Sequence, residues 1–183
     1  MNSTPPHRLH TPDDTHDFVR SAVEQYQAAL LRYATRLVGD ADRARDVVQD
    51  TFVRLMSQPL EAVDGHLAEW LFTVCRNRAY DLHRKEGRMK HFDDGEVERV
   101  SAHEPRPGSE LEASETNAAV LRLIDHLPPT QQEVIRLKFQ NGFSYKEISR
   151  ITSLSIGNVG FLIHTAIKSL RREWAASTAR GTE

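Results

Sequence analysis

The sequence has 183 residues, of which 39% are hydrophobic and 27% are charged, and its formal net charge is −2 at pH 7. This composition excludes a disordered chain, and the length is enough for one medium domain or two small ones. The single cysteine excludes an intrachain disulfide and fits a reducing cytoplasm. We expect no signal peptide, no membrane insertion, no metal site and no cofactor, because the sequence lacks the corresponding patterns.

Apolar residues recur at helical spacing along the chain, and alternating strand patterns are absent, so we expect an all-α fold. A first helix is indicated from Phe18 to Leu37. Gly39 separates it from a second helix, for which Asp40 is the expected N-cap. The second helix should bury one stripe of residues, namely Ala44, Val47, Val48, Thr51, Phe52 and Leu55.

A third helix is predicted from about Leu67, after a loop. Trp70 shares a stripe with Val74, so we place it in the core. The opposite side of this helix is polar and begins a basic region. Residues 76–90 hold six Lys or Arg against two acidic residues, a net charge of +4.

An acidic linker is expected next. Residues 92–115 hold eight acidic residues against two arginines, a net charge of −6, and they contain prolines without any apolar period. Apolar spacing resumes at Val120. Pro129 fits the first turn of the following helix, which should bury Val134, Ile135, Leu137 and Phe139.

The last part of the chain has the pattern of a helix-turn-helix. Ser144 and Glu147 have the spacing of a capping box, and Ser155 is the expected N-cap of the last helix. Residues 136–174 hold seven Lys or Arg against two Glu, a net charge of +5. This pattern favours DNA binding, and a helical pair without DNA function is the alternative.

Two pairs of motifs resemble the extracytoplasmic-function (ECF) subfamily of the sigma-70 family of RNA polymerase sigma factors. Residues 46–52 (DVVQDTF) and 70–77 (WLFTVCRN) resemble the first folded domain of that family. Residues 127–135 (LPPTQQEVI) and 142–148 (GFSYKEI) resemble its second. The predicted organisation is therefore an N-terminal tail (1–17), a sigma2-like helical bundle (18–90), a flexible acidic linker (91–115), a sigma4-like helix-turn-helix domain (116–174) and a C-terminal tail (175–183).

The resemblance implies an alternative sigma factor that directs promoter recognition, DNA melting and transcription initiation, and that is not an enzyme. It implies core RNA polymerase and promoter DNA as partners, together with an anti-sigma factor. A cytoplasmic protein that is monomeric when free is expected.

The resemblance also implies three groups of site residues. The polymerase-binding group consists of Asp46, Gln49 and Asp50. The group for the −10 element consists of Arg76, Asn77, Tyr80, Arg84 and Lys85, beside a loop over residues 57–66 that holds a flipped base. The group for the −35 element consists of Asn158, Phe161, His164, Thr165, Lys168, Arg171 and Arg172. Gly160 and Thr165 depart from the family pattern, which usually has basic residues there.

Three alternatives remain open at this stage. Asp46 and Asp50 lie one helical turn apart, so they are either two solvated acids or, as the resemblance implies, a surface whose repulsion a basic partner offsets. The chain could be a dimeric helix-turn-helix regulator, although the 46–52 motif argues against that. An enzyme would need a nucleophile with a base, a catalytic carboxylate pair, a metal cluster or a phosphate loop, and none is visible.

Overall fold

The computed structural model describes residues 12–90 and 111–180, with side chains described for 15–84 and 117–177. Every regular element in these ranges is a helix, which confirms the all-α fold. The predicted linker (91–115) and N-terminal tail (1–17) lie largely outside the described residues, whereas residues 175–180 of the predicted C-terminal tail belong to the last helix. The elements are α1 (Pro12–Val38), α2 (Ala41–Met56), the short 3-10 helix η1 (Leu60–Ala62), α3 (Leu67–Lys90), α4 (Leu111–Asp125), α5 (Pro129–Phe139), α6 (Tyr145–Thr152) and α7 (Ile156–Arg180).

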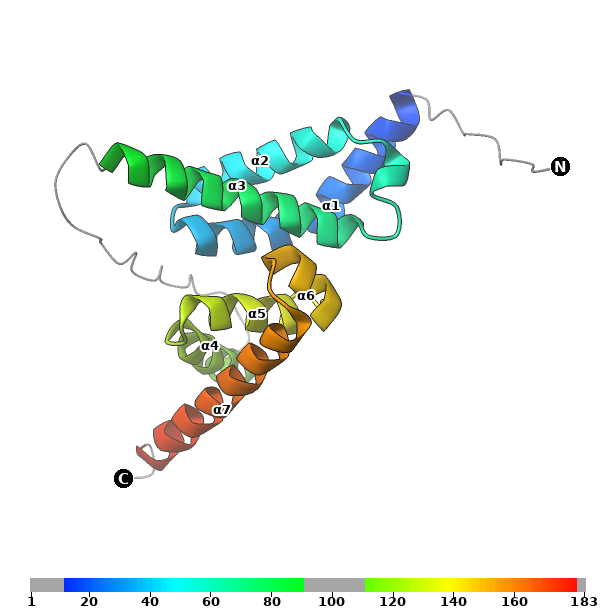
Figure 1. Cartoon of the computed structure of the whole chain (residues 1–183). Coiled ribbons are helices and arrows are strands. Elements are labelled where there is room, and N and C mark those ends of the chain that lie inside the picture. Colours follow the sequence, from blue (N-terminus) through cyan, green and yellow to red (C-terminus); the bar gives the residue numbers. More distant parts are fainter. Residues whose placement is uncertain (1–11, 91–110, 181–183) are drawn as a thin grey trace. The chain divides into compact units, whose positions relative to one another are not determined.

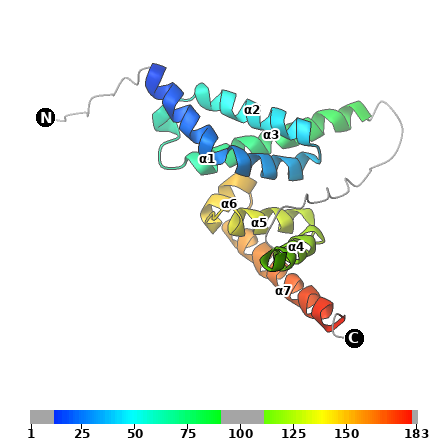
Figure 2. The same cartoon turned by 180° about the vertical axis from the view of Figure 1, so that it is seen from behind.

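The chain forms two compact units, residues 1–97 and 98–183. In the first unit, α1, α2 and α3 pack against one another in all three pairs (Figures 1 and 2). The side chain of Asp40 accepts a hydrogen bond from the Arg43 amide at 2.8 Å, so the predicted N-cap is confirmed. The buried residues of α2 are the six that the helical spacing predicted.

The inward side of α3 differs from the prediction. Phe72 is buried, and its ring centroid lies 5.1 Å from that of Tyr33 on α1. Trp70 is only half-buried, so its placement in the core was wrong. Leu71 and Cys75 are buried, as the helical spacing predicted, and Phe72 and Ala79 complete the stripe with them in place of Trp70 and Val74. Helix α1 also begins at Pro12, ahead of the periodicity that starts at Phe18.

In the second unit, α4, α5 and α6 all pack against α7. The core is formed by apolar residues of α5, α6 and α7, among them Val134, Ile148, Val159 and Ile163. Pro129 begins α5 as predicted, but Phe139 at its end is 63% exposed, so the prediction of burial was wrong there. Phe139 is the last helical residue, and the chain turns away soon after it through Gly142, whose φ is 76°.

Arg136 is a buried cation, although it was counted in the predicted basic region. Its guanidinium donates to Asp125 Oδ1 at 2.5 Å, and only 4% of the residue is exposed. The pair joins α5 to the end of α4. Because breaking a buried ion pair leaves an uncompensated charge, we assign Arg136 to the structure of this unit and not to its charged surface.

Helix α6 begins at the predicted capping box, which is confirmed. The Ser144 amide donates to Glu147 Oε2 at 2.7 Å, and the Glu147 amide donates to Ser144 Oγ at 3.3 Å. A turn follows at Ser153, the one non-glycine residue with positive φ (60°) in the described part of the chain. The Asn158 amide then donates to Ser155 Oγ at 3.2 Å, which confirms Ser155 as the cap of α7. These hydrogen bonds cap the N-terminal ends of α6 and α7.

Removal of the cap is expected to destabilise the second unit. Ser144→Ala should lower its free energy of unfolding by about 1 kcal/mol.

Hydrogen bonds from Ser144, through its side chain and its backbone, lower the pKa of the Glu147 carboxyl. A lowered pKa stabilises the fold above the unfolded pKa, and this contribution is lost as the pH falls through the folded value. The difference in free energy of unfolding between wild type and Glu147→Gln should therefore become smaller below about pH 4.

The measurement is urea unfolding of the full chain in a Trp70→Phe background. This background leaves Trp174 as the one tryptophan, and Trp174 lies on α7. If the difference in free energy of unfolding between wild type and Glu147→Gln stays constant from pH 7 to pH 3, the Glu147 carboxylate does not stabilise the cap.

Candidate functional site

Helix α2 presents an acidic face in the first unit. Asp46 and Gln49 are exposed. Asp50 is part-buried, and its Oδ2 accepts a hydrogen bond from Arg78 Nε of α3 at 2.6 Å. The charge of Asp50 is thus already offset within the chain, which is an arrangement that neither of the two interpretations of this pair included. Asp46 and Gln49 are the more accessible members of the predicted group.

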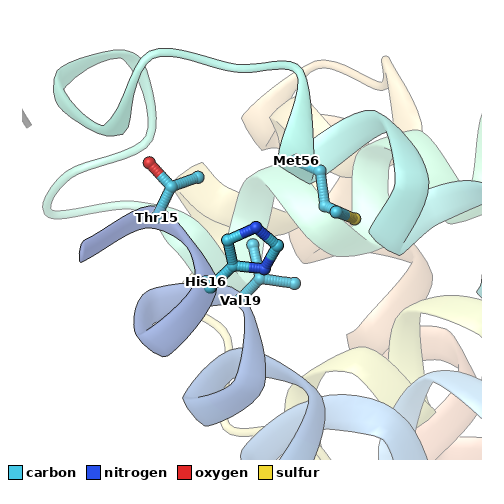
Figure 3. A pocket seen from close by; sticks show the side chains of 4 residues that line it. All are labelled: Thr15, His16, Val19 and Met56. Carbon is cyan, nitrogen blue, oxygen red and sulfur yellow. The ribbon is translucent and has the colours of Figure 1, made fainter. Parts of the chain in front are cut away.

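The same face of α2 continues into apolar side chains that the sequence reasoning missed. Val53 is 54% exposed and Met56 is 50% exposed. They follow Asp46 and Gln49 at intervals of three or four residues, so all four share one side of the helix. Met56 also borders a hollow of about 210 Å³, whose other lining residues are Thr15, His16 and Val19 of α1 (Figure 3). On this side of α2, the polar part with Asp46 and Gln49 therefore adjoins an apolar part with Val53 and Met56.

Helix α3 carries the basic and aromatic face. Arg76, Tyr80 and Arg84 follow one another at intervals of four residues, and Asn77 is exposed beside them. The Arg76 guanidinium lies 4.5 Å from the centroid of the Tyr80 ring, and Tyr80 is 47% exposed. Arg84 pairs with Asp81 at 2.5 Å on the same helix. Lys85 belongs to α3, but its side chain lies outside the described residues.

The loop between α2 and α3 is held at its centre. Val63 is fully buried, and η1 precedes it. Gly65 has a φ of 70°, which favours glycine, and the exposed His66 ring nitrogen lies 2.9 Å from the Asp64 carbonyl oxygen. Val63 thus anchors the loop, and Ser57 and His66 at its two ends are exposed.

Helix α7 presents the corresponding face of the second unit. Its exposed residues at helical spacing are Asn158, Phe161, His164, Lys168, Arg171 and Arg172. The uncharged residues lie toward the start of the helix and the cations toward its end. Hydrogen-bonding and apolar side chains, which are the types that read base edges, therefore precede the cations, which are the type that contacts phosphates.

Thr165 is placed differently from the other predicted residues of α7. It is half-buried, and its hydroxyl lies 3.5 Å from Gln131 Nε2 of α5 and donates to the Phe161 carbonyl at 2.9 Å. Its expected outward position is thus only partly realised. A Cβ built on Gly160 would lie 3.7 Å from the Tyr145 ring, in ordinary contact.

Tyr145 and Lys138 extend this face, and the sequence reasoning missed both. Tyr145 is 40% exposed, and Lys138 Nζ lies 5.5 Å from the centroid of its ring. The missing side chain at Gly160 was the available signal, because it leaves room for a neighbouring ring.

None of the helices within residues 12–90 and 111–180 combines the length and the apolar character needed to cross a membrane. The same described residues contain no group of three or more His, Cys, Asp or Glu side chains that could hold a metal ion.

Two protein-family models match the chain. Sigma-70 region 2 matches residues 22–89, and Sigma-70, region 4 matches residues 117–170. The ECF RNA polymerase sigma factor EcfG of Rhodopseudomonas palustris is 31% identical over 159 residues, which cover 86% of this chain and 83% of that protein. The chain belongs to the ECF sigma factors.

Other relatives of this sigma factor agree. The ECF RNA polymerase sigma factor SigL of Mycobacterium tuberculosis is 31% identical over 157 residues, which cover 84% of this chain and 86% of SigL. The structure of the sigma factor RpoE in complex with the anti-sigma factor NepR, from Bartonella quintana, matches with a TM-score of 0.67 and 28% identity, over 85% of this chain and 95% of that one. The protein is accordingly an alternative sigma factor, as the sequence motifs indicated.

Most candidate residues of the sigma factor fall within the matched regions. The α2 and α3 groups lie within residues 22–89. The α7 group up to Lys168 lies within residues 117–170, and Arg171 and Arg172 follow immediately after. The family matches identify sigma-70 regions 2 and 4 in the chain. The role of each side chain within them has to be inferred from its charge, exposure and contacts.

Proposed function

We propose that the three faces divide promoter-directed initiation among them. The α2 face docks on core RNA polymerase, the α3 face holds the opened −10 element, and the α7 face binds the −35 duplex. The observation that carries the proposal is the difference in charge between the three faces, since the α2 face holds the acids Asp46 and Asp50, whereas the α3 and α7 faces hold the exposed cations Arg84, Lys168, Arg171 and Arg172. No covalent step is required of the protein.

The α2 face suits a basic protein surface with an apolar neighbour. Asp46 supplies an exposed carboxylate and Gln49 an exposed amide, while Val53 and Met56 supply apolar area one to three turns further on. A face that combines a charged part with an apolar part provides both steering and burial. This combination favours a protein partner over the phosphate backbone of DNA, which an acidic face would repel.

The α3 face suits separated strands. Tyr80 can stack on an unpaired base, and stacking contributes about 1–3 kcal/mol per base. The Arg76 guanidinium lies over one face of the ring in the free protein. A base can therefore stack on the opposite face or displace the guanidinium toward a phosphate. Asn77 offers a donor and an acceptor to a base edge.

Two further parts of the proposal concern the setting of the protein. We infer an anti-sigma factor as a regulatory partner, because the RpoE structure is a complex with one. The protein acts where the chromosome and its polymerase are, in the cytoplasm, as a free monomer before it binds the polymerase.

The α7 cations give the proposal a quantitative test. Each phosphate contact contributes about 0.9 to the slope of log affinity against log salt. Arg171→Ala should therefore lower that slope by about one and weaken binding to all sequences alike. Arg122→Ala is the control, because Arg122 is an exposed cation on α4. The measurement is fluorescence anisotropy of residues 116–183 on duplex DNA over a salt series. An unchanged slope, or an altered sequence preference, would refute the phosphate assignment of Arg171.

A further inference from the structure

Phe161 stands out on the α7 face. It is 65% exposed, the largest exposed fraction among the large apolar side chains of the described residues. Asn158 lies one turn before it and His164 one turn after it, and both are exposed. An exposed aromatic ring between two polar side chains contributes nothing to the core of this unit. It is available for contact with a ligand.

The surroundings of Phe161 leave the ring room to approach a surface. A Cβ at Gly157, one turn earlier on the same line of the helix, would meet nothing within 4 Å. One turn later, the Thr165 hydroxyl bonds to the Phe161 carbonyl and lies near Gln131, so it is turned toward the protein. The nearest Lys or Arg on that line of α7 is Lys168, two turns away. The ring is therefore the most protruding apolar group on this line.

We propose that Phe161 is a specificity residue that contacts the 5-methyl group of one thymine in the −35 duplex. Within the major groove, the thymine methyl is the apolar feature that distinguishes this base, and an aromatic or methyl side chain is its natural contact. Lys168, Arg171 and Arg172 lie further along α7 and would hold the phosphates that set the register of the helix. This inference rests on the proposed binding of α7 to the −35 duplex.

The absence of a side chain at Gly157, where a Cβ would meet nothing within 4 Å, has a consequence for DNA binding. It lets the start of α7 come close to the base edges, where a short contact from an aromatic ring is possible.

The test is a thymine-to-deoxyuridine scan, which removes one methyl group at a time. The full chain, assembled with core RNA polymerase, is titrated against promoter duplexes selected from a library by run-off transcription, with each −35 thymine replaced in turn. One replacement should weaken binding by wild type about fourfold, the amount expected for one buried methyl group. For Phe161→Ala, the same replacement should have no effect. Phe161→Leu, which keeps an apolar side chain, should retain part of it.

Two results would overturn the inference. One is a scan in which no thymine methyl affects wild type, and the other is a methyl effect that persists in Phe161→Ala. If Phe161→Ala keeps the methyl effect and also loses a protein complex, the ring belongs to a surface for a protein partner. The proposed function fails separately, if the wild-type assembly neither binds nor transcribes any promoter in the library.

Discussion

Replacing Asp46 with lysine is expected to abolish the complex of the sigma factor with core RNA polymerase under conditions that leave its fold unchanged. Asp46 is exposed on α2, so the substitution disturbs no core contact. A like charge placed against a basic partner surface costs several kcal/mol, and loss of a close charge pair costs about 2–5 kcal/mol. The dissociation constant should therefore rise by a factor on the order of 30 or more.

The measurement is co-elution with purified core polymerase, followed by titration. Glu24→Lys is the matched control, because it reverses another exposed carboxylate, which lies on α1. Asp50→Lys is a poorer test, since Asp50 pairs with Arg78 and its reversal would set two cations together within the protein. Undiminished co-elution of Asp46→Lys would remove the α2 face from the docking surface.

Replacement of Tyr80 with alanine is expected to block promoter opening while leaving the −35 interaction intact. The loss of one stacked base should cost about 1–3 kcal/mol, which is roughly 5- to 150-fold in the open-complex equilibrium. The Arg76→Ala, Tyr80→Ala double variant should lose more, because it also loses a cation that can contact a phosphate. Tyr80→Phe keeps the ring and should open promoters nearly as well as wild type.

Permanganate footprinting measures this opening, since it reports unpaired thymines. Anisotropy of each variant on −35 duplex checks that the second unit is unaffected. Normal thymine reactivity in the double variant would show that strand opening depends on other residues.

Much of the helical architecture could be predicted from sequence because the helices are amphipathic and capped. The α2 stripe was predicted in full, since its six apolar or small positions repeat strictly. The caps at Asp40, Ser144 and Ser155 were predictable because each depends on residues no more than three positions away.

The errors arose where tertiary packing decides. Trp70 and Phe139 have the spacing of core residues, but the side of a helix that is buried depends on its neighbours. A leucine, phenylalanine or tryptophan at the margin of an apolar stripe can be either buried in the core or exposed to solvent. Phe72 was accordingly overlooked, although it packs against Tyr33 across the bundle.

The candidate site shows the same limit. Helical spacing placed the exposed residues of α3 and α7 on common faces, and the structure describes them there. It could not show that Asp50 pairs with Arg78, 28 positions away, or that Gln131 approaches Thr165, 34 positions away. Such contacts require the fold itself, and they decide which members of each group are available to a partner.

The central claim, that this protein confers promoter specificity on RNA polymerase, is tested most directly by run-off transcription with purified core polymerase on a promoter library. The account predicts discrete transcripts from a subset of promoters when the protein is added, none from core polymerase alone, and none with Asp46→Lys. Wild-type activity of both Asp46→Lys and Tyr80→Ala would contradict the assignment of the α2 and α3 faces. Transcripts that are the same with and without the protein would contradict the central claim itself.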